Sequence, residues 1–225
     1  MRKPNIILMF IDDLGIGDVS CYNEHSKIHT ENIDRLAQQG IKFTDAHATS
    51  ALCTPSRYGL LTGRYNWRSC LKKLVYVKSE DNMIEEGRMT LASMLKQQGY
   101  RTACIGKWHL GMQWVHTGDG PYDVDYAHPY KMGPNEFGFD YFFGLMASLS
   151  QPPYVYLEND HATAVPDTVS GVKPDMLFNF KYNQTWLPGP TVSGFNVRDV
   201  VPTCQKKVLE QIDKFAQSDE PFFLY

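Results

Sequence analysis

The sequence has no surplus of positive charge, since 22 Lys and Arg face 25 Asp and Glu for a formal net charge of −3 at pH 7. Nucleic-acid binding depends on cations that neutralise phosphates, so nucleic acid is a poor candidate partner. The longest dense apolar run, residues 6–11, is far shorter than the ~20 residues of a membrane-spanning helix. No charged segment followed by an apolar stretch and a cleavage site opens the chain, so we expect no signal peptide in it. Either the protein stays inside the cell, which is cytoplasmic as written, or the signal is not part of this sequence.

Cysteine is also scarce. The five cysteines contain no C-x-x-C pair, which argues against a zinc ribbon or a thioredoxin-like site, and they are too few for a disulfide scaffold. An odd count leaves at least one thiol unpaired. Hydrophobic residues make up 43% and charged residues 21%, as in ordinary globular proteins, which excludes a disordered tail, a collagen-like fibre and a low-complexity array.

Segments typical of strands alternate with segments typical of helices. We expect strands at residues 3–11, 41–46, 102–105 and from 221 onward, and helices at 30–39, 55–62, 90–98 and 203–217. The first strand is apolar throughout, which suits a parallel strand covered by helices on both sides. The alternation predicts an α/β fold with a mostly parallel central sheet and helices on both faces.

Residues 115–200 show few regular periods and are rich in Pro, Gly, Tyr and Asn. A long irregular connection inside a domain is often functional, so we interpret this region as an elaboration over the substrate side. Its aromatic residues either line a binding cleft or pack a loop-rich core. They are Tyr122, Tyr126, Tyr130, Tyr141, Phe142, Phe143, Tyr154 and Tyr156.

Two adjacent carboxylates, Asp12 and Asp13, follow the first predicted strand. Ligands bind at the carboxyl ends of strands in open α/β sheets. Adjacent carboxylates repel unless a cation lies between them, and a hard divalent cation with oxygen ligands would remove that repulsion. The alternative is a solvated strand end whose aspartates cap the next turn.

Cys53 lies just before a predicted helix with Pro55 in its first turn and Arg57 one turn further on. The positive end of the helix and the guanidinium would both attract an anion. A lone cysteine is more often a small buried hydrophobic residue. Here, however, residues 53–64 match the sulfatase signature C-x-P-S-R-x-x-L-x-T-G-R at every fixed position.

A third element is the string G-K-W-H-L-G at residues 106–111. Lys107 and His109 alternate on a predicted extended segment, so both can project to one side. The lysine supplies a positive charge for an oxyanion, and the histidine supplies a proton that titrates near neutral pH. Alone, the pair would suit an exposed lysine and a hydrogen-bonded histidine, but the string resembles the second sulfatase signature.

Together these elements resemble the formylglycine-dependent sulfatases of the arylsulfatase A-like group, in the alkaline phosphatase superfamily. The resemblance implies that a separate maturing enzyme oxidises Cys53 to formylglycine, which is then hydrated. It implies a calcium ion held by Asp12, Asp13 and the modified Cys53, with a further Asp-Asn pair expected beyond Tyr225. A second lysine and the histidine that protonates the leaving group are expected there too.

The same resemblance assigns roles to the remaining residues. Lys107 would bind the sulfate and neutralise its charge in the transition state, His109 would take or hold a proton of the diol, and Arg57 would fix the diol. Ser148 would bind the sulfate or the diol, with Ser150 as its rival.

The resemblance predicts a sulfuric ester hydrolase that cleaves aryl or carbohydrate sulfates. A phosphodiesterase or phosphonate hydrolase of the same superfamily is the alternative enzyme. The partners implied are a sulfated small molecule or glycan and the maturing enzyme. Similar sulfatases are often exported to the periplasm or outside the cell.

The last five residues begin an apolar strand with no turn or polar tail after it. We therefore expect residues 1–225 to be the amino-terminal part of the catalytic domain, with the carboxyl-terminal part absent, and this chain to be inactive alone. A further alternative is an inactive fragment that acts only as a folding or interaction unit.

Overall fold

The computed structural model describes residues 2–76, 82–171 and 187–225. The chain divides into two compact units. The larger unit contains the chain up to Leu8 together with Thr49–Tyr225, and the smaller one is Met9–Ala48. The smaller unit contains η1 (Ile16–Asp18) and α1 (Glu31–Gln39). No helix among the described residues is both long and apolar enough to cross a membrane.

The larger unit is built on a six-stranded sheet in the order β1–β8–β2–β3–β4–β5. The first four strands are parallel, and β4 and β5 are antiparallel additions at one edge. A second, two-stranded antiparallel sheet joins β6 and β7. The bounds are β1 (Ile6–Ile7), β2 (Arg101–Lys107), β3 (Tyr141–Leu145), β4 (Leu157–Glu158), β5 (His161–Ala162), β6 (Thr168–Ser170), β7 (Gly189–Thr191) and β8 (Phe222–Leu224), with α2 (Cys53–Thr62), η2 (Asn66–Arg68), α3 (Leu91–Gln97), η4 (Val197–Asp199) and α4 (Val200–Ala216).

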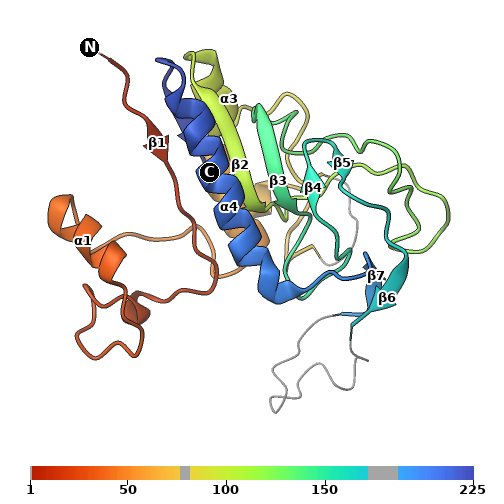
Figure 1. Ribbon diagram of the computed structural model, residues 1–225, viewed down its shortest axis with the longest axis horizontal. Coiled ribbons are helices and arrows are strands. Elements are labelled where there is room, and N and C mark those ends of the chain that lie inside the picture. Colours follow the sequence, from red (N-terminus) through yellow and green to blue (C-terminus); the bar gives the residue numbers. More distant parts are fainter. Residues whose placement is uncertain (1, 77–81, 172–186) are drawn as a thin grey trace. The chain divides into compact units, whose positions relative to one another are not determined.

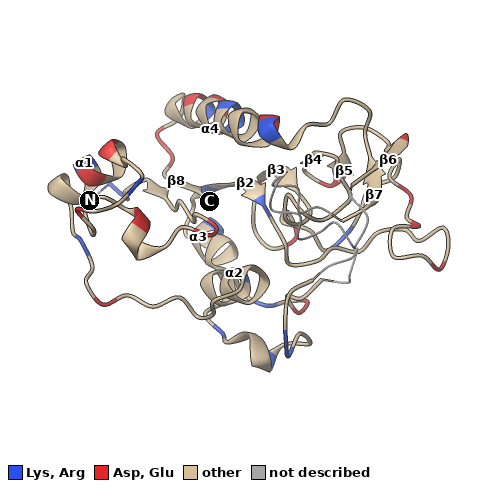
Figure 2. Ribbon diagram, turned by 90° about the horizontal axis from the view of Figure 1, so that it is seen from below, with Lys and Arg blue, Asp and Glu red and all other residues tan. Residues whose placement is uncertain are grey.

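Helices cover both faces of this sheet, as the alternation of segments predicted. Figure 1 shows α4 lying along β2 and β3, and Figure 2 shows it on one side of the sheet with α2 and α3 on the other. Successive residues of a strand point to opposite faces. In β2, Ala103 belongs to the core under α4, where Phe215 stacks on Phe222 with ring centroids 4.6 Å apart. The next residue, Cys104, belongs to the core under α2 and α3.

The four predicted helices are confirmed, with shifts of up to three residues at their ends. The helix α2 begins at Cys53 and ends at Gly63, whose φ of 67° is the left-handed conformation that glycine adopts readily. The helix α3 begins after Thr90, which forms a capping box with Ser93. The helix α4 begins at Val200, before the predicted start.

The predicted strands are less accurate. Of residues 3–11 only Ile6–Ile7 form a strand, because in the described residues this segment pairs on one side alone, with β8. Residues 41–46 form no strand; the carbonyl of Phe43 accepts instead from the Tyr22 hydroxyl, at 2.8 Å. The central strand β3 lies in the region that we predicted to be irregular.

The aromatic residues of residues 115–200 form mainly a core. Five of the eight named above are buried in the larger unit, namely Tyr126, Tyr130, Phe142, Phe143 and Tyr154. Trp114, which is also buried, contacts two of them, with ring centroids 5.2 Å and 4.8 Å away. Of the two interpretations left open by the sequence, the structure favours the packed core.

In the register of β2 and β3, Gly106 pairs with Gly144. A Cβ atom added to Gly144 would lie 1.7 Å from the carbonyl oxygen of Gly106, a distance that only a backbone shift can relieve. Glycine is therefore required here for the two central strands to keep their register.

We expect Gly144→Ala to lower the free energy of unfolding by about 3 kcal/mol, the upper part of the range for overpacked sites. Gly17→Ala is the matched control, because an added methyl group there would lie 3.8 Å from Asn23 Nδ2, an ordinary van der Waals contact. Urea unfolding of both variants measures the effect. Equal stabilities would show that the two strands separate at little cost.

Candidate active site

The residue that matches the signature cysteine stands at the start of α2. Cys53 is the first helical residue, after Leu52 at the N-cap, rather than just before the helix as predicted. Its side chain is half-buried, whereas residues 54–59 are buried. The first backbone N–H groups of a helix have no partner within the helix and carry partial positive charge. An anion beside Cys53 would therefore face a favourable field.

Arg57 ties this helix to the end of the central strand β2. It is 4% exposed, and its Nη1 donates to the carbonyl oxygen of Lys107 at 2.8 Å and to the hydroxyl of Tyr225 at 3.2 Å. A buried guanidinium is stable only with such acceptors. The structure thus brings together two of the predicted residues, Arg57 through its side chain and Lys107 through its backbone.

The chain turns after β2 instead of remaining extended. Trp108 and His109 donate their backbone N–H groups to the carbonyls of Leu145 and Met146, at 3.0 Å and 2.8 Å. His109 has a φ of 59°, in the left-handed region. The prediction that Lys107 and His109 alternate on an extended segment is therefore wrong, because the backbone turns between them to follow the end of β3.

The carbonyl of Tyr76 is the acceptor that holds the His109 ring. The Nε2 atom of His109 lies 2.7 Å from this oxygen, and the side-chain Nε2 of Gln151 donates to it at 3.1 Å. A carbonyl oxygen only accepts, so His109 Nε2 carries the proton and a neutral ring has its lone pair on Nδ1. The N–H of Tyr76 in turn donates to Thr54 Oγ1 at 3.4 Å, beside Cys53.

The predicted serine lies in the turn that follows β3. Ser148 and its rival Ser150 are both half-buried, and Ser150 Oγ donates to Ser148 Oγ at 3.3 Å. The backbone N–H of Gln151 closes the turn onto the carbonyl of Ser148 at 3.0 Å. The two serine hydroxyls are thus in contact with each other. The turn that carries them also contacts the Tyr76 carbonyl, through the side chain of Gln151.

Gln151 and Tyr76 are the residues that the sequence did not indicate. Tyr76 acts through its backbone carbonyl, and any residue type supplies that group. Gln151 is a single amide before two prolines, with no partner at a recognisable spacing. Only the folded chain brings both to His109.

The two predicted metal-binding aspartates belong to the smaller unit. Asp12 and Asp13 form an exposed turn, and Asp13 has a φ of 58°, which aspartate tolerates better than most residues. They do not directly follow the strand as predicted, because β1 ends at Ile7. Their carboxylates are the ligand type that calcium prefers, but two carboxylates supply at most about four of the 6–8 oxygens it takes. Within residues 2–76, 82–171 and 187–225, no group of three or more His, Cys, Asp or Glu side chains is placed to hold a metal ion.

Two further cysteines, Cys104 and Cys204, have thiols whose pKa values are raised by burial. All five cysteines are free thiols. Burial in β2 raises the pKa of the Cys104 thiol well above its ordinary value, although the nearby charge of Arg57 opposes the shift. Burial also raises the pKa of Cys204, on α4, to about 11. Both thiols are therefore protonated and unreactive near neutral pH.

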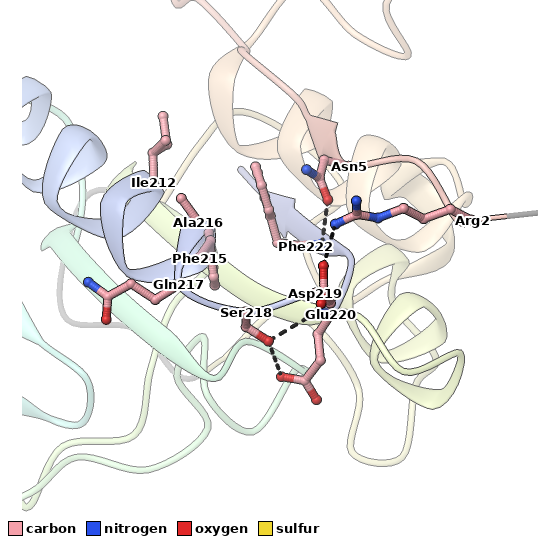
Figure 3. A pocket seen from close by; sticks show the side chains of 10 residues that line it. All are labelled: Arg2, Asn5, Ile212, Phe215, Ala216, Gln217, Ser218, Asp219, Glu220 and Phe222. Atoms are coloured by element: carbon pink, nitrogen blue, oxygen red, sulfur yellow. Dashed lines mark hydrogen bonds and ion pairs between the residues drawn. The ribbon is translucent and has the colours of Figure 1, made fainter.

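A hollow of about 460 Å³ lies at the opposite end of the sheet, before β1 and β8 begin (Figure 3). Phe215 and Phe222 contribute its apolar part, and Arg2 pairs with Asp219 at 3.2 Å beside it. None of the predicted site residues lines it. Its position at the amino-terminal ends of the strands separates it from the residues described above.

Comparison with known proteins identifies the family of the chain. Residues 4–225 match the family described as Sulfatase. The whole chain aligns with 47% of the length of an N-acetylgalactosamine-6-O-sulfatase of Bacteroides thetaiotaomicron, at 37% sequence identity. It also aligns over its whole length with 40% of human arylsulfatase A, at 34% identity. A solved structure from work on glycosaminoglycan metabolism by Bacteroides thetaiotaomicron superposes with a TM-score of 0.81 at 34% identity, covering the whole of this chain and 50% of the other. The chain thus spans about half the length of these relatives, and it belongs to the sulfatase family.

Proposed function

We propose that the protein hydrolyses sulfate monoesters, with a hydroxyl of hydrated formylglycine at position 53 as the nucleophile and a calcium ion as the Lewis acid that polarises the sulfate. The observation that carries the proposal is the joining of two signatures: the helix that begins at Cys53 is fixed by Arg57 to the end of the strand that carries Lys107 and leads to His109. The whole activity also requires residues that the longer relatives have and this chain does not span.

Position 53 requires modification because a thiol is poorly suited to the reaction. A thiol that attacked a sulfate ester would remain as a stable adduct. In formylglycine the Cβ–Sγ bond of Cys53 is replaced by a Cβ=O bond; the separate maturing enzyme would perform this two-electron oxidation with an external oxidant such as molecular oxygen, and the sulfur would leave as sulfide. Hydration of that aldehyde supplies one hydroxyl that can attack sulfur and a second that lets the side chain return to the aldehyde.

The neighbouring residues of this chain would stabilise charge and move protons. The Lys107 ammonium would neutralise the sulfate oxygens as charge develops on them. His109 would accept a proton at Nδ1, because its Nε2–H is held by the Tyr76 carbonyl. Arg57 would keep the helix terminus and the position-53 side chain in place, and Ser148 or its neighbour Ser150 would contribute a hydroxyl to the sulfate or the diol.

Asp12 and Asp13 would contribute carboxylate oxygens to the calcium ion, together with an oxygen on the modified Cys53. A bound calcium ion would polarise the sulfate and lower the pKa of the attacking hydroxyl. The remaining ligands would come from the Asp-Asn pair expected beyond Tyr225.

A sulfated carbohydrate is the substrate class that the relatives favour. The bacterial relative that is 37% identical over the whole chain is named for the 6-O-sulfate of N-acetylgalactosamine. Human arylsulfatase A, at 34% identity, keeps aryl sulfates within the proposal.

The proposal is tested with the full-length gene product, coexpressed with a formylglycine-generating enzyme and assayed with calcium. We expect turnover of an aryl sulfate or a 6-sulfated hexosamine and none by Cys53→Ala. The tryptic peptide 43–57 should lose sulfur and gain an aldehyde, while peptide 102–107, which carries Cys104, stays unmodified as the internal control. An unmodified Cys53 in a competent host would contradict the proposal, and faster turnover of a phosphate diester would favour the phosphodiesterase alternative.

Lys107→Ala in the same protein should lower kcat by roughly 10²-fold, the effect of removing one donor that stabilises transition-state charge. The fold should survive, because the bond from Arg57 is made to the backbone carbonyl of Lys107 and not to its side chain. Lys206→Ala is the control, since Lys206 lies exposed on α4. Thermal unfolding and kinetics of both variants measure the difference, and an unchanged kcat for Lys107→Ala would remove Lys107 from the site.

A further inference from the structure

We propose that Gln151 is a positioning residue that fixes the orientation of the His109 ring through the carbonyl of Tyr76. The inference rests on the proposed function for its effect on catalysis, but not for its effect on the ring. Gln151 is 8% exposed and ends the turn that carries Ser148 and Ser150. It has no place in either sulfatase signature.

The chemistry of the acceptor fixes how the Gln151 amide is oriented. The Tyr76 carbonyl cannot donate, so the NH₂ group of Gln151 must face it, and Nε2 lies 3.1 Å away. The amide oxygen Oε1 then points to a buried position where it has no hydrogen-bond partner among the described residues. A buried acceptor without a partner is unfavourable. Among the described residues, the side-chain amide is therefore held by the hydrogen bond that Nε2 donates to Tyr76, while Oε1 accepts none.

The His109 ring depends on that same oxygen. The backbone of His109 is already fixed by its N–H bond to Met146, at 2.8 Å. What remains to be set is the rotation of the imidazole, and the 2.7 Å contact from Nε2 to the Tyr76 carbonyl sets it. A carbonyl oxygen has two lone pairs, and here His109 and Gln151 occupy one each.

Removal of the Gln151 donor would take away one hydrogen bond that fixes the Tyr76 carbonyl oxygen. Other bonds of Tyr76 act on other atoms: its N–H donates to Thr54 Oγ1 at 3.4 Å, at the long end of the hydrogen-bond range, and its hydroxyl lies 3.2 Å from Cys70 Sγ. The imidazole would then sample more orientations, and Nδ1 would lie less often in the position to take a proton. Such a change lowers kcat and leaves substrate binding almost unchanged, since Gln151 is buried.

The test compares Gln151→Met with Gln211→Met in the full-length, matured protein. Methionine keeps the length of glutamine and removes the amide, and Gln211 is equally buried, at 6% exposed, but lies on α4. For Gln151→Met we expect kcat to fall roughly 10-fold, part of the 10²–10⁴-fold that a positioned acid or base contributes, with KM within about 2-fold of the parent. Gln211→Met should keep both constants.

A chemical probe measures the ring directly. Diethyl pyrocarbonate modifies accessible neutral imidazoles, and His109 is only 1% exposed in the parent. The tryptic peptide 108–131 also contains His116 and His128, both exposed, which serve as internal references in the same spectrum. We expect the His109 modification rate, relative to His116, to rise roughly 10-fold in Gln151→Met, to match the roughly 10-fold fall in kcat expected from a less well positioned proton acceptor. The rate should stay constant in Gln211→Met.

The two measurements separate the possible failures. If Gln151→Met and Gln211→Met match in both kcat and His109 modification, the proposal is overturned. If the parent hydrolyses no sulfate ester while His109 modification still rises in Gln151→Met, the hold on the ring is supported and the proposed sulfatase reaction is not. Should Gln151→Met fail to fold, Gln151→Glu keeps the shape of the side chain; its ionised carboxylate cannot donate to Tyr76, so the same two changes are expected above its pKa.

Discussion

The buried guanidinium of Arg57 is the constraint on which the site depends. A charge that is 4% exposed needs acceptors, and the carbonyl at the end of β2 is the acceptor 2.8 Å away. The bond can form only if the first turns of α2 lie over the carboxyl end of that strand. In open parallel sheets this is the end where ligands bind. The position of Cys53 therefore follows from the hydrogen bond that Arg57 donates to the carbonyl of Lys107.

The sequence predicted the helices well because their ends carry local signals. Gly63 ends α2 in a left-handed conformation, and Thr90 with Ser93 begins α3. Such signals are contained in a few neighbouring residues and do not require knowledge of the rest of the chain. The two signature strings were recognised for the same reason, since each is contiguous.

What the sequence could not predict depends on contacts between distant segments. The strand β3 has aromatic and glycine residues in an irregular region, and its pairing with β2 on one side and β4 on the other makes it a central strand. The left-handed turn at His109 arises from bonds to residues that follow β3. The first strand was overestimated because an apolar run looks the same whether one or both of its edges are paired.

Two kinds of link hold the predicted residues together, and both end on backbone carbonyls. Arg57 binds the carbonyl of Lys107, whereas His109 and Gln151 bind the carbonyl of Tyr76. A carbonyl acceptor is independent of the side chain that its residue carries. The backbone of Lys107 therefore holds α2 in place whichever side chain that position carries. This separation explains why a sequence motif shows the side chains proposed to react and not the groups that hold them, because those groups are backbone carbonyls and a glutamine that only the folded chain brings to Tyr76.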